Sequence, residues 1–153
     1  MLKALTHFDP KYIPVYVCAP GAEPTIFMSE EVVLGKNVYI GPNTQLLGAV
    51  RLGKNVRIVG NVVIDGTTGP IIIGAWTRIE PFVFINGPAK IGENCVIRAN
   101  CVFHNSICGE SCDIKGEIES STLGDNVETY ASCIMHNSSC GDHCKLGAMR
   151  IEY

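Results

Sequence analysis

A six-residue period of aliphatic side chains between Val33 and Phe103 constrains the fold more than any other feature of the sequence. The period has two runs: Leu34, Ile40, Leu46, Leu52, Ile58 and Ile64, then Ile73, Ile79, Ile85, Ile91, Ile97 and Phe103. A helix would repeat its apolar residues at three and four positions, and a single strand would alternate by two. A sustained period of six instead predicts an all-β solenoid, a parallel β-helix built from hexapeptide repeats.

Two further positions of the repeat have a defined chemistry. Three residues after an aliphatic position, where a corner favours left-handed backbone geometry, stand Asn37, Asn43, Asn55, Asn94, Asn100 and Asn126. Small residues that should point inward are Val38, Thr44, Val50, Val56, Val62, Thr77, Val83 and Ala89. Because three hexads close one triangular coil of about eighteen residues, the stretch 34–152 predicts six or seven coils.

Composition agrees with one solenoid domain and a short arm. The hydrophobic fraction is 46% but the aromatic fraction only 7%, which favours a narrow core of stacked aliphatic side chains. Residues 1–30 have no period and contain several prolines, so we expect an extended N-terminal arm followed by a β-helix domain over residues 31–153. Such an arm would cover the open end of the solenoid, and docking to a partner is the alternative.

The charge and the amino terminus exclude several classes of function. A formal net charge of −3 provides no basic surface for nucleic acid or for an anionic membrane. No apolar run reaches the length of a transmembrane span, and the first residues lack the apolar segment of a secretion signal. We therefore expect a cytoplasmic protein that binds neither nucleic acid nor membrane.

Seven of the eight cysteines fit the repeat as core residues. Inward small positions hold Cys95, Cys101, Cys112, Cys133 and Cys144, and aliphatic positions hold Cys108 and Cys140. Free cysteine behaves as a small buried hydrophobe. The pairs Cys108/Cys112 and Cys140/Cys144 look like metal ligands, but they lie in hexapeptide register and their spacing is wider than in most zinc sites. The sequence therefore predicts a structural role and no metal.

The repeat departs from strict period six in two ways. The segment 65–70 adds three residues between Ile64 and Ile73, which predicts a small corner loop. Later, some repeats are one residue shorter than six. Three segments then share one register: Phe103-His-Asn-Ser, Ile118-Glu-Ser-Ser and Met135-His-Asn-Ser. Insertions at solenoid corners often line a binding face, so the irregular coils are where function is expected.

Stacking of these segments predicts an outward column of polar side chains, which we call the histidine column: Asn86, His104, Glu119 and His136. Asn105, Ser120 and Asn137 would form a parallel row, and Ser106, Ser121 and Ser138 another. A histidine beside a carboxylate has the composition of a general base, and it also suits a metal ligand. The alternative is a polar ladder that solvates one edge or lines a subunit contact.

Four segments resemble the left-handed β-helix at the C-terminus of sugar-1-phosphate nucleotidylyltransferases, including the bifunctional enzymes that acetylate glucosamine 1-phosphate and uridylylate the product. They are Ile73–Glu80, Ile91–Ile97, Gly116–Asn126 and Cys140–Ala148, and the resemblance covers residues 31–148. The resemblance implies the left hand of the helix, a homotrimer, acetyl-CoA bound between subunits, and a sugar phosphate or nucleotide sugar as partner.

The family's own catalytic set is absent. Aligned through Leu123-Gly124 and Cys140-Gly141, the positions of the family's base histidine and following tyrosine hold Ala131 and Ile134. No nucleotide-binding half precedes the repeats, so nucleotidyl transfer is not expected from this chain alone.

Our first hypothesis is therefore an acetyl-CoA-dependent acyltransferase with a relocated base. The expected catalytic residues are His104, Glu119 and His136. Substrate contacts are expected from Asn86, Asn105, Asn137 and Tyr130, and cofactor contacts from Gly141, Lys145 and Gly147.

Two other classes of function stay open at this point. One is a non-catalytic assembly or regulatory module related to nucleotidylyltransferase tails. The other is a zinc hydratase of the γ-carbonic anhydrase type that would use His104, His136 and His143, although the Arg-Gly-Asp strand of that family is absent.

Overall fold

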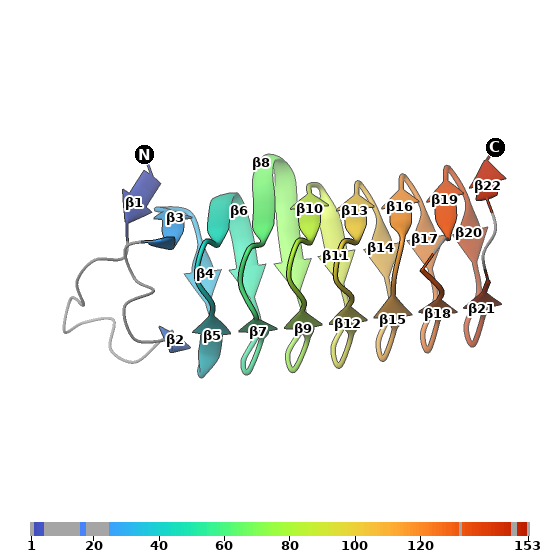
Figure 1. Cartoon of the computed structure of the whole chain (residues 1–153), viewed down its shortest axis with the longest axis horizontal. Coiled ribbons are helices and arrows are strands. Elements are labelled where there is room, and N and C mark those ends of the chain that lie inside the picture. Colours follow the sequence, from blue (N-terminus) through green and yellow to red (C-terminus); the bar gives the residue numbers. More distant parts are fainter. Residues whose placement is uncertain (1, 5–15, 18–24, 132, 148–149, 153) are drawn as a thin grey trace.

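The chain winds into a solenoid whose coils stack along one axis from the N-terminal to the C-terminal end (Figure 1). The computed structural model describes residues 2–4, 16–17, 25–131, 133–147 and 150–152, and all regular structure in these residues is β-strand. The coils number about seven. The predicted fold, a left-handed parallel β-helix of six or seven coils, is confirmed.

Each coil contributes one strand to each of three faces. Face 1 contains β3 (Phe27–Ser29), the first parts of β6 (Gln45–Leu52) and β8 (Val63–Ile73), β10 (Phe84–Asn86), β13 (Val102–His104), β16 (Glu117–Glu119), β19 (Ile134–His136) and β22 (Arg150–Glu152). Face 2 contains β4 (Val33–Leu34), the second parts of β6 and β8, β11 (Ala89–Ile91), β14 (Ile107–Cys108), β17 (Thr122–Leu123) and β20 (Ser139–Cys140). Face 3 contains β5 (Val38–Ile40), β7 (Arg57–Ile58), β9 (Arg78–Ile79), β12 (Val96–Ile97), β15 (Asp113–Ile114), β18 (Glu128–Thr129) and β21 (Lys145–Leu146).

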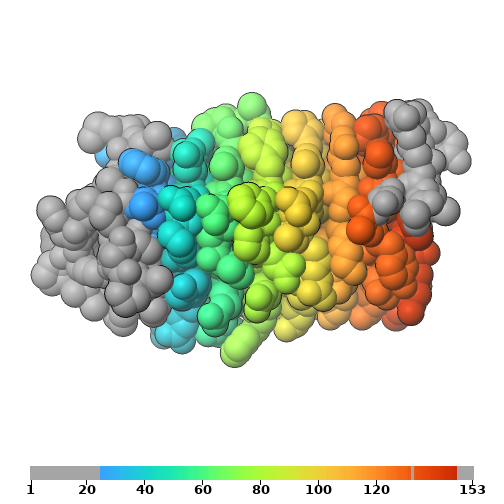
Figure 2. Space-filling view, viewed as in Figure 1, coloured from blue at the N-terminus to red at the C-terminus, as the bar shows by residue number. Residues whose placement is uncertain are grey.

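The register shows how the coil length varies along the axis. Ile40 pairs with Ile58, an advance of 18 residues, and this is the length expected from three hexads. Asp113 pairs with Glu128, an advance of only 15. The later coils are thus shorter, as the lost residues predicted, and Figure 2 shows each coil as one band in sequence order.

Inward side chains fill the narrow space between the faces. The predicted small positions from Val38 to Ala89 are all buried, and so are the isoleucines of the period. Phe103 is the largest fully buried side chain. Five of the cysteines are buried as well, whereas Cys140 and Cys144 near the last coil are half-buried. The aliphatic core expected from the composition is therefore present.

Corner residues have the left-handed backbone that the repeat predicts. All six of the predicted asparagines have positive φ, and the other non-glycine residues with positive φ are Asn61, Trp76, Phe82, Asn105, Ser111, Ser120, Asn137 and His143. Asparagine tolerates this region better than most residues because its short polar side chain can hydrogen-bond locally. The aromatic residues Trp76 and Phe82 are the departures from that rule.

The expected corner loop at residues 65–70 is instead part of a strand. β8 continues from Val63 to Ile73 through the corner and pairs with β6 on both sides of a bulge between Gly48 and Val50. The Asp65 side chain accepts hydrogen bonds from the amide and hydroxyl of Thr67, at 2.9 and 2.6 Å. The added residues therefore continue β8 from face 1 to face 2 as one arched strand. This is possible because β6 pairs with β8 on both faces.

Two short strands of the N-terminal arm pair with the first coil. β1 (Leu2–Ala4) runs antiparallel to β3, and β2 (Tyr16–Val17) runs parallel to β5. The rest of residues 1–24 lies outside the described residues. The division into an arm over 1–30 and a domain over 31–153 stays a prediction, and β3 already belongs to face 1.

Candidate functional site

The structure stacks the histidine column in the predicted order. Asn86 pairs with His104, His104 with Glu119, and Glu119 with His136. These residues end the face 1 strands, next to the corner between faces 1 and 2. Asp65 continues the column toward the N-terminus by pairing with Asn86. The column is therefore a property of the register and brings residues from four coils into one line.

His136 has the closest contacts in the column. Its Nε2 lies 3.1 Å from Oε1 of Glu117 and 3.6 Å from Oε2 of Glu119. The imidazole is 23% exposed and both carboxylates 45%, so the ring is more sheltered from solvent than the two carboxylates. A carboxylate that accepts a hydrogen bond from an imidazole orients the ring and fixes its tautomer.

Glu117 is the residue that sequence reasoning missed. It lies two residues before Glu119 on β16, and both glutamates face outward because side chains alternate along a strand. The alternation was therefore a signal that could have found it. The column joins residues of one register, His104, Glu119 and His136, whereas Glu117 is in register with Val102 and Ile134.

The asparagines assigned to substrate contacts lie beside the column. Asn105 and Asn137 form the corner directly after His104 and His136, both with positive φ, and the Asn105 amide donates to Ser120 Oγ at 3.3 Å. Asn86 is half-buried, and its Oδ1 accepts a hydrogen bond of 3.1 Å from the Thr68 hydroxyl. All three lie on the same edge of the solenoid as the histidines.

Three inward serines hold the corner beneath the column. Ser106, Ser121 and Ser138 each donate from Oγ to the carbonyl two residues earlier, that of His104, Glu119 or His136, at 2.7 Å. Each serine hydroxyl except the last also accepts from the next serine's amide, at 3.0 and 3.2 Å. The predicted serine row is thus buried or half-buried. At each shortened corner, the serine hydroxyl supplies a hydrogen bond to the backbone where one residue has been lost.

The column can perform two kinds of chemistry. An imidazole next to a carboxylate can accept a proton from a hydroxyl or an amine. Alternatively, one ligand atom each from Glu117, Glu119 and His136 lies within 4.8 Å of the others, which allows the three to share a divalent cation. The sequence analysis considered a metal ligand for this column, and a hydrogen bond between His136 and Glu117 accounts for the same geometry.

The residues assigned to cofactor binding lie elsewhere in a single chain. Lys145 belongs to β21 on face 3, where its Nζ lies 3.6 Å from Oε2 of Glu128. Gly141 and Gly147 flank that strand, and a Cβ added at either would meet nothing within 4 Å. Tyr130, assigned to substrate binding, is 41% exposed at the end of a face 3 strand. None of the four therefore meets the histidine column within one chain.

The three histidines of the zinc-hydratase hypothesis are also separated. His143 is exposed, with φ of 59°, at the corner between faces 2 and 3. His104 and His136 end strands of face 1, which meets the other edge of face 2. A zinc site from these histidines does not form within one chain.

Face 3 carries a ladder of ion pairs. Arg98 donates two hydrogen bonds to Asp113, at 2.9 and 2.7 Å, and a third of 3.3 Å to Glu80. The hydrogen bonds from Arg98 lower the pKa of Asp113, and Asp113 in turn raises the pKa of Arg98. Lys115 lies over the ring of Tyr130, 5.6 Å from its centroid. These contacts join charged side chains of face 3 into a structural network.

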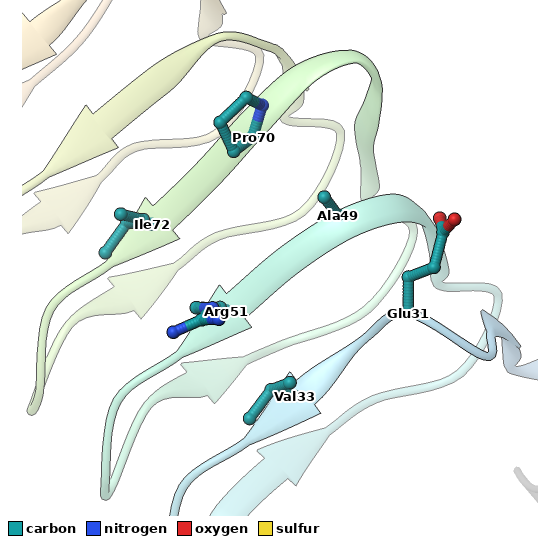
Figure 3. A pocket seen from close by; sticks show the side chains of 6 residues that line it. All are labelled: Glu31, Val33, Ala49, Arg51, Pro70 and Ile72. Atoms are coloured by element: carbon teal, nitrogen blue, oxygen red, sulfur yellow. The ribbon is translucent and has the colours of Figure 1, made fainter.

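A shallow hollow of about 320 Å³ lies on face 2 near the N-terminal end (Figure 3). Its floor is formed by Val33, Arg51 and Ile72, which stand side by side on β4, β6 and β8. Glu31, Ala49 and Pro70 complete the lining. The hollow lies on earlier coils than His104 and His136, so it is not part of the column.

No helix in the described part of the chain has the length and hydropathy needed to cross a membrane.

The middle of the chain matches a known repeat family. Residues 31–66 and 69–105 match the family described as bacterial transferase hexapeptide (six repeats). The chain therefore contains hexapeptide repeats over these residues, and the match includes Asn86 and His104 of the histidine column but not Glu119 and His136.

The curated relatives include O-acyltransferases and a bifunctional protein. An acyl-[acyl-carrier-protein]–UDP-N-acetylglucosamine O-acyltransferase of Rickettsia bellii is 41% identical over 68 residues, which are 44% of this chain and 23% of that protein. The same enzyme of Campylobacter concisus is 30% identical over 103 residues, 56% of this chain and 39% of the relative. The bifunctional protein GlmU of Synechococcus elongatus is 35% identical over 75 residues, 49% of this chain and 15% of the relative. The chain thus spans less than half the length of these relatives.

Among solved structures, the acetyltransferase domain of PglB from Neisseria gonorrhoeae FA1090 is similar to this fold. The TM-score is 0.54 at 14% sequence identity, over 76% of this chain and 49% of that chain. An identity this low supports the fold alone.

Proposed function

We propose that this chain is an acyltransferase domain that transfers an acyl group from a thioester to a hydroxyl or amino group of a sugar-nucleotide acceptor. The observation that carries the proposal is the contact of His136 Nε2 with Glu117, at 3.1 Å, in a column of polar residues from four coils. The class of substrate is taken from the relatives of Rickettsia bellii and Campylobacter concisus, which are acyl-[acyl-carrier-protein]–UDP-N-acetylglucosamine O-acyltransferases.

His136 is the proposed general base. Its ring accepts the proton of the acceptor O–H or N–H as the oxygen or nitrogen attacks the thioester carbonyl. The tetrahedral intermediate then collapses and releases the donor as a thiolate, which takes up a proton. Glu117 is a positioning residue that orients the ring, and Glu119 stabilises the imidazolium that forms.

The remaining residues of the column contact the acceptor in this proposal. Asn86 and His104 are half-buried on the coils before Glu119, and Asn105 and Asn137 lie at the neighbouring corner. Amide and imidazole groups at this edge suit the hydroxyl groups of a sugar because each offers both donors and acceptors.

The thioester donor is proposed to lie between subunits of a homotrimer. Gly141, Lys145 and Gly147 do not reach the column within one chain, so a neighbouring copy has to present them if they bind the donor. Open space beside both glycines leaves their backbone accessible to a ligand, and Lys145 is an exposed cation for a donor phosphate. The donor is acetyl-CoA or an acyl carrier protein thioester.

The experiment is a titration of acetyl-CoA into the protein by calorimetry, followed by an assay of free thiol release with UDP-N-acetylglucosamine as acceptor. We expect measurable heat and a release rate that falls at least 100-fold in His136→Gln. His143→Gln is the matched control and should keep the full rate, because that histidine is exposed at another corner. No heat at millimolar acetyl-CoA and no reaction with an acyl carrier protein thioester would overturn the proposal.

A non-catalytic assembly module is the second candidate. It is favoured by Ala131, exposed in the structure, at the position where the resemblance places the family's base histidine. A stable complex with a separate nucleotidylyltransferase, together with no turnover, would support this alternative.

A further inference from the structure

Three cysteines of two adjacent coils converge inside the solenoid. Cys95, Cys108 and Cys112 are buried, and their three Sγ atoms all lie within 4.8 Å of one another. We call these residues the thiol cluster. The sequence pattern assigned each of them separately to the core, and the register is what brings them together.

We propose that the thiol cluster is a binding site for a single soft, thiophilic cation, with Cu(I) the best fit. Thiolate is the protein ligand that soft d¹⁰ ions prefer. Three sulfur atoms bonded to one ion at about 2.3 Å are about 4 Å apart in a trigonal arrangement, which agrees with the spacing of the cluster. Structural zinc sites use four ligands, so a set of three favours Cu(I).

The polar surroundings of the sulfurs are unusual for a hydrophobic core. The Cys112 amide donates a 3.5 Å hydrogen bond to Cys95 Sγ, and Cys95 Sγ lies 3.2 Å from the carbonyl oxygen of Gly109. Hydrogen bonds from Cys108 and Cys95 lower the pKa of Cys112, and the same bond from Cys112 raises the pKa of Cys108. The sulfur atoms therefore lie among backbone polar groups as well as apolar side chains.

Packing alone does not call for cysteine at these positions. The inward residues stacked before Cys95 and Cys112 are Val38, Val56 and Thr77, and those stacked before Cys108 include Ile73 and Ile91. Aliphatic or threonine side chains therefore fill the same two columns in the earlier coils. The volume of these positions therefore does not by itself require three mutually close thiols within two coils.

The cluster also has a short path to solvent. Cys108 and Cys112 flank the corner formed by Gly109, Glu110 and Ser111, and the last two of these residues are exposed. An ion can therefore reach the sulfurs by opening one corner, without separating the coils. Binding would release the thiol protons to solvent.

Competition with a chromophoric chelator tests the proposal. The reduced full-length protein is titrated without oxygen with Cu(I) held by bicinchoninate, and chelator bleaching and the near-ultraviolet sulfur-to-copper band are recorded. We expect one equivalent of Cu(I) per chain. X-ray absorption of the loaded protein should show three sulfur neighbours, and this measurement needs no variant.

Matched double variants locate the site. Cys95→Ala with Cys108→Ala should lower the affinity at least 100-fold. Cys101→Ala with Cys133→Ala also removes two buried thiols, but from another column, and should retain full affinity. Cys140→Ala with Cys144→Ala should do the same. No copper transfer from the chelator, equal loss in all three variants, or loss only in the Cys140/Cys144 variant would overturn the proposal.

Discussion

At the scale of single residues, the corners share one backbone conformation although the residue types at these corners differ. The six asparagines predicted from the repeat have the left-handed backbone, and Trp76 takes the same geometry with φ of 63°. A non-glycine residue without a local hydrogen-bonding side chain is destabilised there by roughly 1–2 kcal/mol. Trp76 is also 59% exposed, so burial offsets little of that strain.

We predict that Trp76→Asn stabilises the protein. Asparagine relieves the strain at this corner, and the gain should be about 1 kcal/mol, equivalent to a rise of roughly 2–4 °C in Tm. Thermal unfolding followed by circular dichroism measures the change. The reverse substitution at a regular corner, Asn94→Trp, should lower the Tm, and a lower Tm in Trp76→Asn would show that the indole makes a stabilising contact.

Residue-level reasoning located the site only in part. His104, Glu119 and His136 were predictable because a shared sequence register becomes a spatial column when coils stack. Glu117 was not, because its contact with His136 joins neighbouring registers and depends on side-chain direction. The thiol cluster escaped for a similar reason, since Cys108 lies at an aliphatic position of the repeat, whereas Cys95 and Cys112 lie at inward small positions.

At the scale of elements, the serine row explains how the shortened corners keep their shape. Ser121 Oγ donates to the Glu119 carbonyl at 2.7 Å and accepts from the Ser138 amide at 3.2 Å. One buried hydroxyl thus links two coils directly under the histidine column.

Ser121→Ala should therefore be destabilising by about 1–3 kcal/mol, because the Ser138 amide loses its acceptor and the Glu119 carbonyl keeps only the hydrogen bond from the Asn137 amide. Urea unfolding gives the free-energy difference. Ser139→Ala is the matched control: Ser139 is exposed on face 2, and its loss should change stability by less than about 0.5 kcal/mol. Equal effects of the two substitutions would contradict the structural role of the row.

The face 3 ladder makes a prediction about pH. Arg98 lowers the pKa of Asp113, so the ion pair stabilises the fold above the unfolded-state pKa of about 3.9 and loses this effect as pH falls through the folded-state value. Because both side chains are partly exposed, the contribution should be about 0.5–1 kcal/mol.

The substitution Asp113→Asn removes the ion pair and therefore measures its contribution to the free energy of unfolding. At pH 7 it should be less stable than the parent by that amount, and the difference should shrink toward pH 2. Chemical unfolding at a series of pH values measures both quantities. A difference that stays constant across this range would mean that the pair is not the cause.

At the scale of the whole molecule, the sequence period predicts the architecture but not the assembly. Parallel pairing, coil length, the inward columns and the asparagine corners all follow from one spacing rule, and the structure has each of them. The prediction of a loop at residues 65–70 was wrong, because these residues form a strand only through pairing with β6, which is distant in sequence. Lys145, Gly141 and Gly147 were assigned to the cofactor without support from the period, and the structure places Lys145 on face 3, away from the column.

This separation leads to a prediction about oligomeric state. If the donor site is shared between copies, the active species is a trimer, and specific activity should fall when dilution drives the protein to monomers. Sedimentation velocity and activity measured over the same concentration range provide the comparison. Full activity of a monomer would contradict the shared site.

The central claim is that His136, held by Glu117, acts as the base for acyl transfer. The most direct measurement is the steady-state rate of thiol release from the thioester donor in the presence of a sugar-nucleotide acceptor, for the parent, Glu117→Gln, His136→Gln and His143→Gln. We predict that kcat falls at least 100-fold in His136→Gln and about tenfold in Glu117→Gln with KM little changed, while His143→Gln matches the parent. Equal rates in the parent and His136→Gln would contradict the claim.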